Sequence, residues 1–429
     1  MGPIIIFDKS VLESLNPDEA VWLDHFCLAN ITPLFFIETL ADLEKEVRKG
    51  RTPEQVVGSL ASKTPELGKP NTHHRTLLEG ELSGAAQLDL VTGRPHIVGG
   101  KHVELGGKKG VIFQEAPEEE AFRRWQRGQF LEVERSIARA WRRALSGVDL
   151  EATYRAYQGF FPIGRPRNLA EVKRIVDFYV DDPDQRRILD FALTLQGVTP
   201  RFRDEIINRW RSAGELQIKI FAPYLAHLLS VDLFFNLAIA ADLIGRYRPS
   251  NKVDVAYLYY LPFCMVFTSN DNLHRQMVPL FLRDKQSFVL GADLKADLAQ
   301  LDAHYDAFPE ETKRSGIMSF AFYPPHDTGF LITGLWDKHM APGWREVDKA
   351  ERTPPDPAMG KAIVDEITRI EKEATAVPAG RQVDSDQADS MIVKRTIRAR
   401  RGKWNIVSPE IANRRKNDKG EWEDGPPEK

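Results

Sequence analysis

Short apolar runs that end in polar residues are the most regular feature of this chain. Residues 4–7 form a β-branched run that is followed by Asp8, and residues 263–267 form an apolar run that is followed by four polar residues, 268–271. A run of this length with polar residues massed at one end is typical of a strand buried on both faces of a parallel sheet. Residues 287–291 form a further predicted strand.

Helix signals alternate with these strands near the N-terminus. Asn16 followed by Pro17 predicts a helix start, because Asn is a favoured cap and Pro suits the first helical position. Residues 30–36 predict the next strand, and residues 37–49 a helix that carries Glu38 in its first turn. The order strand, helix, strand, helix indicates a parallel sheet.

This pattern is interrupted for a long interval and then resumes. A small β hairpin is predicted at residues 95–103 and 110–114, and residues 232–244 predict a buried core helix. The other predicted helices are 117–145, 169–179, 183–195, 200–212, 216–229 and 292–305. We therefore expect an α/β core from residues 1–50 and 230–345, a mostly helical insertion with the hairpin at 51–229, and a charged, Pro-rich, flexible tail at 346–429.

Composition narrows the class of protein. The formal net charge of −3 over 429 residues predicts no global field that would attract nucleic acid. Cys27 and Cys264, the two cysteines, lie in apolar surroundings, which predicts reduced core thiols and a cytoplasmic location. The N-terminus does not resemble a secretion signal, and no apolar run approaches bilayer length, so we expect no membrane partner.

Four carboxylates are the candidate catalytic residues. Asp8 and Asp271 follow predicted strands, and Glu38 and Asp254 open predicted helices. If all four lie at the carboxyl edge of one parallel sheet, their mutual repulsion would be relieved by Mg²⁺ or Mn²⁺, which prefer oxygen ligands. Such an ion could activate water against a phosphodiester. Each acid alone could instead be a helix cap or turn former.

Neutral and basic residues accompany these acids. We expect hydrogen bonds to the carboxylates or to a phosphate from Thr268, Ser269 and Asn270. The arginines of the predicted helix at 117–145 could contact nucleic acid or pair with its glutamates. A denser basic run lies in the tail, and it is a candidate for salt-sensitive nucleic-acid contact. The candidate residues of that run are Arg395, Arg398, Arg400 and Arg401.

The order of these motifs resembles the PIN-domain ribonucleases. The matching segments are IIIFDKS with Asp8, ITPLFFIETL with Glu38, the helix opened by Asp254 and the strand that runs into TSNDN with Asp271. The resemblance covers roughly residues 1–50 and 230–295. It implies a three-layer α/β/α domain with a central parallel sheet, a Mg²⁺- or Mn²⁺-binding acidic pocket formed by these four acids, and RNA as the substrate.

The chain departs from that family in two respects. Compact PIN domains have a far shorter link between the second and third acids, so the large insertion takes no role from the resemblance. The TSNDN spacing also allows Asn270, rather than Asp271, to occupy the last acidic position.

Two alternatives to a nuclease remain open. One is a haloacid-dehalogenase-type phosphatase with Asp8 as nucleophile, although that family has a second aspartate where this chain has Ser10. The other is a catalytically silent scaffold that binds RNA, or a protein partner through the insertion or the tail. Neutralisation of the acids by Lys9 would favour the scaffold. The sequence also leaves a homodimer open.

Overall fold

The structure is a computed structural model, and it describes most of the chain up to residue 346. The described residues are 2–47, 50–66, 70–96, 100–105, 108–113, 117–146, 149–157, 165–346 and 398–412, with the short pieces 369, 375–376, 392–393, 414–416 and 422–424.

A four-stranded, wholly parallel sheet organises the fold, in the order β2-β1-β5-β6. The strands are β2 (Leu28–Asn30), β1 (Ile4–Phe7), β5 (Val266–Ser269) and β6 (Ser287–Leu290). Ile5 of β1 pairs with Val266 of β5, so the two central strands come from opposite ends of the described core. The predicted α/β class and parallel sheet are confirmed.

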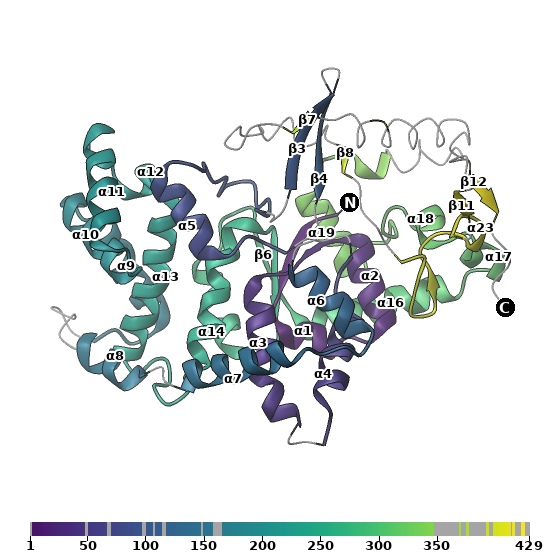
Figure 1. The fold of residues 1–429 in the computed structure, drawn as a ribbon, viewed down its shortest axis with the longest axis horizontal. Coiled ribbons are helices and arrows are strands. Elements are labelled where there is room, and N and C mark those ends of the chain that lie inside the picture. The colour runs from purple at the N-terminus through teal and green to yellow at the C-terminus, as the bar shows by residue number, and fades with distance from the viewer. Residues whose placement is uncertain are drawn as a thin grey trace.

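Helices cover both faces of this sheet. Alternate residues of β1 belong to two separate hydrophobic clusters, with Ile4 and Ile6 in one and Ile5 and Phe7 in the other. Period-two alternation between two apolar clusters explains why β1 has no polar position. The sheet is therefore the middle layer between two helical layers (Figure 1).

The layer on the Ile5 side contains the N-terminal helices and those that follow β6. Asn16 and Glu19 form a capping box at the start of α2, which confirms the predicted helix start. The helices of this layer are α1 (Lys9–Ser14), α2 (Pro17–Phe26), α3 (Pro33–Val47), α4 (Pro53–Ala61), α6 (Pro117–Gln126), α7 (Glu132–Ser146), α16 (Gly291–Asp306), α17 (Glu310–Arg314), α18 (Ile317–Phe320) and α19 (Leu331–His339).

Two predicted elements of this layer are wrong in their limits. The strand predicted at 30–36 ends at Asn30, and Pro33 begins α3, because proline suits the first helical position. The helix predicted at 117–145 is two helices, since Gly128 adopts a left-handed backbone (φ 70°) between α6 and α7.

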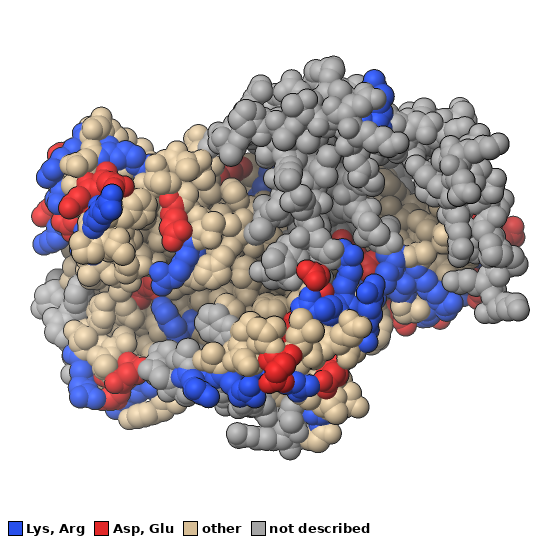
Figure 2. All heavy atoms as spheres, viewed as in Figure 1, with Lys and Arg blue, Asp and Glu red and all other residues tan. Residues whose placement is uncertain are grey.

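Three arginines of α6 and α7 pair with acids in the described structure, and they are Arg124, Arg135 and Arg139. Arg124 pairs with Glu134 at 2.7 Å, and Arg135 pairs with Glu54. Figure 2 shows basic side chains along this part of the surface with acidic side chains beside them. These ion pairs support the alternative in which the arginines of α6 and α7 pair with acids rather than contact nucleic acid.

The other layer extends into a lobe of helices at one end of the molecule (Figure 1). Its elements are α5 (His74–Ser83), α8 (Leu150–Tyr157), α9 (Leu169–Val180), α10 (Gln185–Leu195), α11 (Pro200–Ser212), α12 (Ile218–Phe221), α13 (Pro223–Ala240), α14 (Asn251–Ala256), the 3-10 helix η2 (Tyr257–Phe263), α15 (Asn272–Met277) and the 3-10 helix η3 (Val278–Leu280).

Helix α13 is the buried centre of this lobe. The helices predicted at 216–229 and 232–244 are wrong in their division, because α13 runs through both and the chain breaks instead at Ala222 and Pro223. Its length and composition would suffice for a membrane span, contrary to the expectation that no apolar run approaches that length. However, 78% of the helix is buried inside the fold, and a buried core helix can have the same length and hydropathy as a membrane span.

The predicted hairpin is present as β3 (Gly100–Leu105) and β4 (Lys108–Phe113), in a small sheet with β7 (Thr375–Ala376) and β8 (Ile392–Val393).

Two further strand pairs lie near the C-terminus. They are β9 (Arg400–Arg401) with β10 (Trp404–Asn405), and β11 (Arg414–Lys416) with β12 (Trp422–Asp424), with α23 (Pro409–Ala412) between them.

Residues 398–412 pack on the core, so the flexible tail predicted from residue 346 is wrong for this segment. Trp404 and Ile406 are buried in the cluster on the Ile5 side, and the Trp404 ring contacts Trp22 with 4.8 Å between centroids. Two apolar anchors and several ion pairs therefore hold the segment, although its composition is strongly basic.

Candidate acidic site

Asp8 lies where β1 ends, and it is only 4% exposed. Its Oδ1 accepts hydrogen bonds from Ser10 Oγ (2.7 Å) and Val11 N (3.0 Å), so it caps α1. Asp8 therefore has the helix-cap role that the sequence left open as an alternative. Ser10 stands where the phosphatase alternative would need an acid, and it serves as a donor to Asp8.

The other oxygen of Asp8 belongs to a buried network with Ser269 and His274. Ser269 Oγ lies 2.5 Å from Asp8 Oδ2 and 2.8 Å from His274 Nδ1, and it accepts a hydrogen bond from Asp271 N (2.9 Å). A serine hydroxyl has one proton, and it is donated to the carboxylate. His274 Nδ1 then donates to Ser269 Oγ.

The second ring nitrogen of His274 is also a donor. Nε2 lies 2.6 Å from the backbone carbonyl oxygen of Asp254, which can only accept. Burial alone would lower the pKa of His274, but the hydrogen bond and charge of Asp8 raise it above its ordinary value. Burial would likewise raise the pKa of Asp8, but His274 and Ser269 hold it below its ordinary value. The pair is a buried imidazolium and carboxylate.

Glu38 projects from α3, in its second turn rather than the predicted first turn, because the helix begins at Pro33. Its Oε2 accepts a hydrogen bond from Tyr257 Oη at 2.7 Å. Burial raises the pKa of Glu38 to about 7, and the charges of Asp8 and Asp254 add to this rise. Glu38 therefore exchanges a proton near neutral pH.

Asp254 is the fourth residue of α14 and does not open the helix, contrary to the expectation, since α14 begins at Asn251. Its Oδ2 is buried without a hydrogen-bond partner among the described residues. Burial raises the pKa of Asp254 to about 6, and the charge of Asp271 raises it further against the opposing effect of His274. An unpartnered carboxylate oxygen among like charges is suited to a cation.

Asp271 follows β5 and caps α15, where its Oδ1 accepts from Leu273 N at 2.6 Å. The three neutral residues before it differ in position. Ser269 is fully buried on Asp8, Asn270 is exposed and lines the site, and Thr268 Oγ1 is buried without a partner among the described residues. The hydrogen bond predicted from Ser269 to a carboxylate is confirmed, and that from Thr268 is wrong because its side chain faces the core.

All four predicted acids line one cavity of about 260 Å³ at the carboxyl edge of the sheet. Asp42, on the same helix as Glu38, also lines it. Arg248 is the one basic residue in the lining. The complete lining is Asp8, Ser10, Glu38, Ala41, Asp42, Arg248, Ser250, Val253, Asp254, Tyr257, Asn270 and Asp271.

Lys9 does not pair directly with the four acids. Its buried Nζ lies 2.8 Å from Asp42 Oδ2 and 3.6 Å from Glu13 Oε1. Its charge still holds the pKa of Glu38 below the value that burial alone would give. Lys9 thus offsets part of the negative charge of the cavity without closing it.

The donor chemistry of this cavity fits a hard divalent cation, since its polar lining is dominated by carboxylate oxygens. In the described part of the chain, however, no three His, Cys, Asp or Glu side chains converge closely enough to hold an ion as they stand. Ligation would therefore require rotation of side chains such as Glu38 and Asp254.

Two of the four candidate arginines of the tail form ion pairs with acids. Arg401 is buried and pairs with Asp24 at 2.5 Å, and Arg398 pairs with Glu66. The burial of Arg401 on Asp24 contradicts the predicted nucleic-acid contact for that residue. For Arg398, whose side chain is partly exposed, the contact stays a prediction. Arg400 is exposed, and Arg395 lies outside the described residues.

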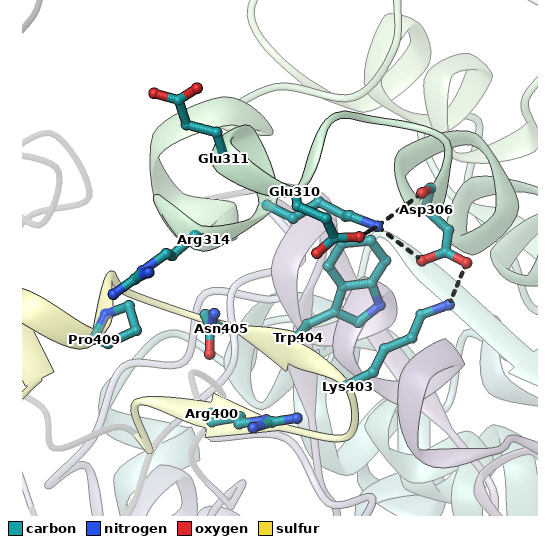
Figure 3. Close-up of a pocket in the computed structure, with 10 residues that line it drawn as sticks. Asp306, Glu310, Glu311, Arg314, Arg400, Lys403, Trp404, Asn405 and Pro409 are labelled. Carbon is teal, nitrogen blue, oxygen red and sulfur yellow. Dashed lines mark hydrogen bonds and ion pairs between the residues drawn. The ribbon is translucent and has the colours of Figure 1, made fainter. Parts of the chain in front are cut away.

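A larger cavity of about 750 Å³ lies beside α17 and β10 (Figure 3). Asp306, at the end of α16, receives ion pairs there from Lys313 (3.6 Å) and Lys403 (3.3 Å). Gly291 begins the same helix next to Asn270, so one helix length of about 24 Å separates the two cavities. The larger cavity is distant from the acidic site, and its lysines form ion pairs with its acids.

Two residues of the acidic site, Tyr257 and Arg248, were missed from sequence, whereas His274 was weighed there only as a contact for a phosphate. His274 follows Asp271 by one helical turn, Tyr257 follows Asp254 at the same spacing, and Arg248 lies in the loop before α14. The helical spacing was a usable signal for His274 and Tyr257.

Comparisons of this chain with protein-family models, with curated proteins and with solved structures gave no match.

Proposed function

We propose that this chain is a divalent-metal-dependent, PIN-like endoribonuclease that hydrolyses phosphodiester bonds in the acidic cavity. The observation that carries the proposal is that Asp8, Glu38, Asp254 and Asp271 all line one cavity at the carboxyl edge of a parallel sheet. Ligands of open α/β sheets bind at that edge.

The charge distribution supports a cation in the cavity. Glu38 and Asp254 have raised pKa values, and an oxygen of Asp254 is buried without a partner in the described structure. We propose that Glu38, Asp254 and Asp271 hold Mg²⁺ or Mn²⁺, with Asp8 as a fourth acid whose position is fixed by Ser269. The ion would supply Lewis-acid activation of water and neutralise charge on the phosphate.

The residues of the chain have separate roles in this proposal. The His274 imidazolium holds Asp8 ionised beneath the cavity, and Tyr257 orients Glu38 through its hydroxyl. Glu38 would then bind the ion through the carboxylate that Tyr257 orients.

The test is cleavage of a fluorescent RNA with Mn²⁺ by the full chain and by three variants. Asp254→Asn and Glu38→Gln change charge without removing a helix cap, whereas Asp8→Asn also disturbs α1. We expect the first two variants to lose activity on the order of a hundredfold. Asp284→Asn, an exposed acid outside the cavity, is the matched control. Unchanged turnover in both cavity variants would overturn the proposal.

The silent scaffold is the second candidate, because no three described acids converge as a ligand set. It predicts that the unmodified chain binds RNA or a protein partner but cleaves no RNA with Mg²⁺ or Mn²⁺. The same cleavage assay therefore separates the two candidates.

A further inference from the structure

The larger cavity lies between two parts of the chain that are far apart in sequence. One wall comes from the end of α16 and from α17, and the other comes from β9, β10 and the start of α23 (Figure 3). Its volume of about 750 Å³ lies within the range of ligand pockets. Four basic and three acidic side chains line it.

The two lysines of this lining are already paired with acids. Lys313 pairs with Glu310 at 2.6 Å and with Asp306 at 3.6 Å. Lys403 pairs with Asp306 at 3.3 Å and with Asp302 at 2.8 Å. These pairs join α17 and the β9–β10 hairpin to the end of α16, so we expect them to position the walls rather than to bind a ligand.

The two arginines of the lining are more available to a ligand. Arg400 is exposed, and its guanidinium pairs with no acid among the described residues. Arg314 pairs with Glu410 at 3.2 Å, but the two side chains are 70% and 62% exposed. Because exposed ion pairs are weak, a carboxylate of a ligand can replace Glu410 at little cost.

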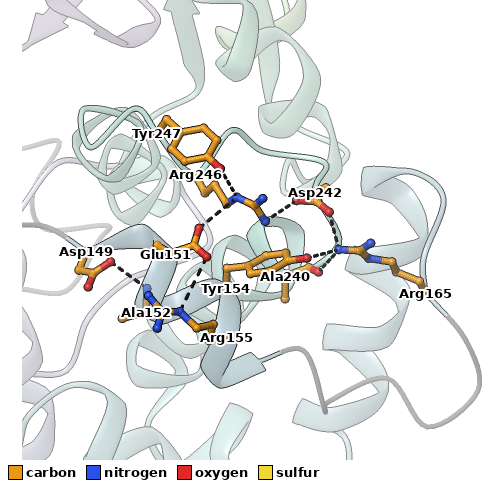
Figure 4. A network of polar contacts seen from close by, with 10 residues as sticks. All are labelled: Asp149, Glu151, Ala152, Tyr154, Arg155, Arg165, Ala240, Asp242, Arg246 and Tyr247. Carbon is orange, nitrogen blue, oxygen red and sulfur yellow. Dashed lines mark hydrogen bonds and ion pairs between the residues drawn. The ribbon is translucent and has the colours of Figure 1, made fainter.

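A second arginine cluster on the surface shows the contrast. Figure 4 shows this cluster beside α8, where Arg165 pairs with Asp242 at 2.6 Å and Arg246 pairs with both Asp242 and Glu151. Arg155 also pairs with Glu151, at 3.8 Å. Each arginine drawn there has an acidic partner, whereas Arg400 in the larger cavity has none in the described structure.

The other residues of the lining leave room for an anion. Glu311, the remaining acid, is exposed and points away from the other labelled side chains in Figure 3. Asn405 is paired with Arg400 across the hairpin, and its side-chain amide has no partner among the described residues. A ligand would therefore meet Arg314 on one wall, and Arg400 with a free amide on the other.

This arrangement favours a ligand that carries its negative charges on separate groups. A phosphate would concentrate close to two negative charges near Glu310 and Asp306, whereas single carboxylates need only one guanidinium each. The Asn405 amide can both donate and accept, which suits the groups of a peptide backbone. Arginine clusters are a recurring means of recognising acidic peptide motifs.

We infer that the larger cavity binds an acidic peptide segment of a partner protein, in which Arg314 and Arg400 each contact one carboxylate and Asn405 bonds the backbone. The larger cavity shares no lining residue with the acidic cavity, so the inference is independent of the proposed function. Since Arg314 belongs to α17 and Arg400 to the C-terminal segment, a bound peptide would also tie that segment to the core.

The test measures binding of a labelled hexaglutamate peptide to the full chain by fluorescence anisotropy. We expect Arg400→Ala and Arg314→Ala each to weaken binding about tenfold, since each removes a charge-assisted hydrogen bond. Arg400→Lys should restore only part of the affinity, because lysine keeps the charge but lacks the planar pair of donors. Arg174→Ala, which removes an exposed arginine on α9, is the control and should bind as the unmodified chain does.

A gain of affinity provides a further test. Glu410→Gln removes the acid that competes for Arg314, so affinity for hexaglutamate should rise about threefold. No rise would contradict the assignment of Arg314 as a ligand contact.

Three results would overturn the inference. One is hexaglutamate affinity that is unchanged in both Arg314→Ala and Arg400→Ala, and another is equal binding of a hexaglutamine peptide. The third is tighter binding of a labelled single-stranded RNA hexamer that is lost in Arg400→Ala, because the cavity would then be a nucleic-acid site.

Discussion

His274 links two elements of the acidic site, because its Nε2 atom donates a 2.6 Å hydrogen bond to the backbone carbonyl of Asp254. Its other ring nitrogen reaches Ser269 and, through it, Asp8. The residue is almost fully buried, so it cannot contact a substrate phosphate. It connects the helix that carries one acid with the strand end that carries another.

Replacing this histidine should destabilise the fold. His274→Ala leaves a cavity and removes partners from Ser269 and the Asp254 carbonyl, so we expect a loss of about 2–4 kcal/mol in the free energy of unfolding. Urea denaturation measures the change. Gln276→Ala, at an exposed position of the same helix, is the control and should stay within about 0.5 kcal/mol. A small loss in His274→Ala would show that the linkage is weak.

Stability without metal should depend on pH through Glu38. Its pKa rises from 4.5 to about 7 on folding, so the folded chain binds the proton more tightly than the unfolded chain between these values. The contribution is fully present below about pH 4.5 and is lost as pH rises through 7.

The measurement is the melting temperature of metal-free protein at about pH 5.5 and about pH 8. Glu38→Gln should lose less stability over this range than the unmodified chain. Glu81, whose pKa is also raised by burial to about 7, remains in both proteins and contributes equally. Identical pH profiles for the two proteins would contradict the assignment to Glu38.

Lys9 should tune metal binding. Its charge offsets part of the negative charge of the cavity, so Lys9→Met should strengthen Mn²⁺ binding at neutral pH by about tenfold, because a divalent cation gains more from the loss of a nearby positive charge than the proton on Glu38 does. Isothermal titration calorimetry measures the affinity. Lys285→Met, at an exposed site, is the control. Mn²⁺ affinity that is unchanged in Lys9→Met would contradict this effect of the lysine on the cavity.

Two adjacent arginines of the C-terminal segment should behave differently. Arg401→Ala leaves the Asp24 carboxylate buried without its cation, which should cost about 3–5 kcal/mol of stability. Arg400→Ala, at the exposed neighbouring position, should change stability by less than about 0.5 kcal/mol. Urea denaturation of both variants tests this contrast, and equal effects would contradict the pairing.

Local sequence signals were sufficient where a cap or an apolar run determines the element. The strand at Ile4–Phe7, the capping box at Asn16 and the helix from Gly291 all follow from such signals. The strand predicted across Pro33 failed because an apolar segment of that length suits either a strand or a buried helix. The division of α13 failed because Asp232, which resembles a helix start, is buried inside the helix on Lys252 and Tyr259.

The four acids of the candidate site were predictable because the ends of parallel strands meet at one edge. The residues that connect them were not, since their roles depend on contacts across the chain. Ser269 reaches Asp8 over 261 positions, and Arg401 reaches Asp24 over 377. A basic, proline-rich composition indicated mobility, while long-range ion pairs and Trp404 determine the packing.

The packing of Trp404 on Trp22 also affects how the chain acquires its structure during synthesis. When the sheet and most helices have been synthesised, Trp404, which covers Trp22, and Arg401, which neutralises Asp24, have not yet been made. The surface of α2 must therefore stay incomplete until residues 401 and 404 have been synthesised. We expect this surface to be open to chaperones until the C-terminal segment packs on it.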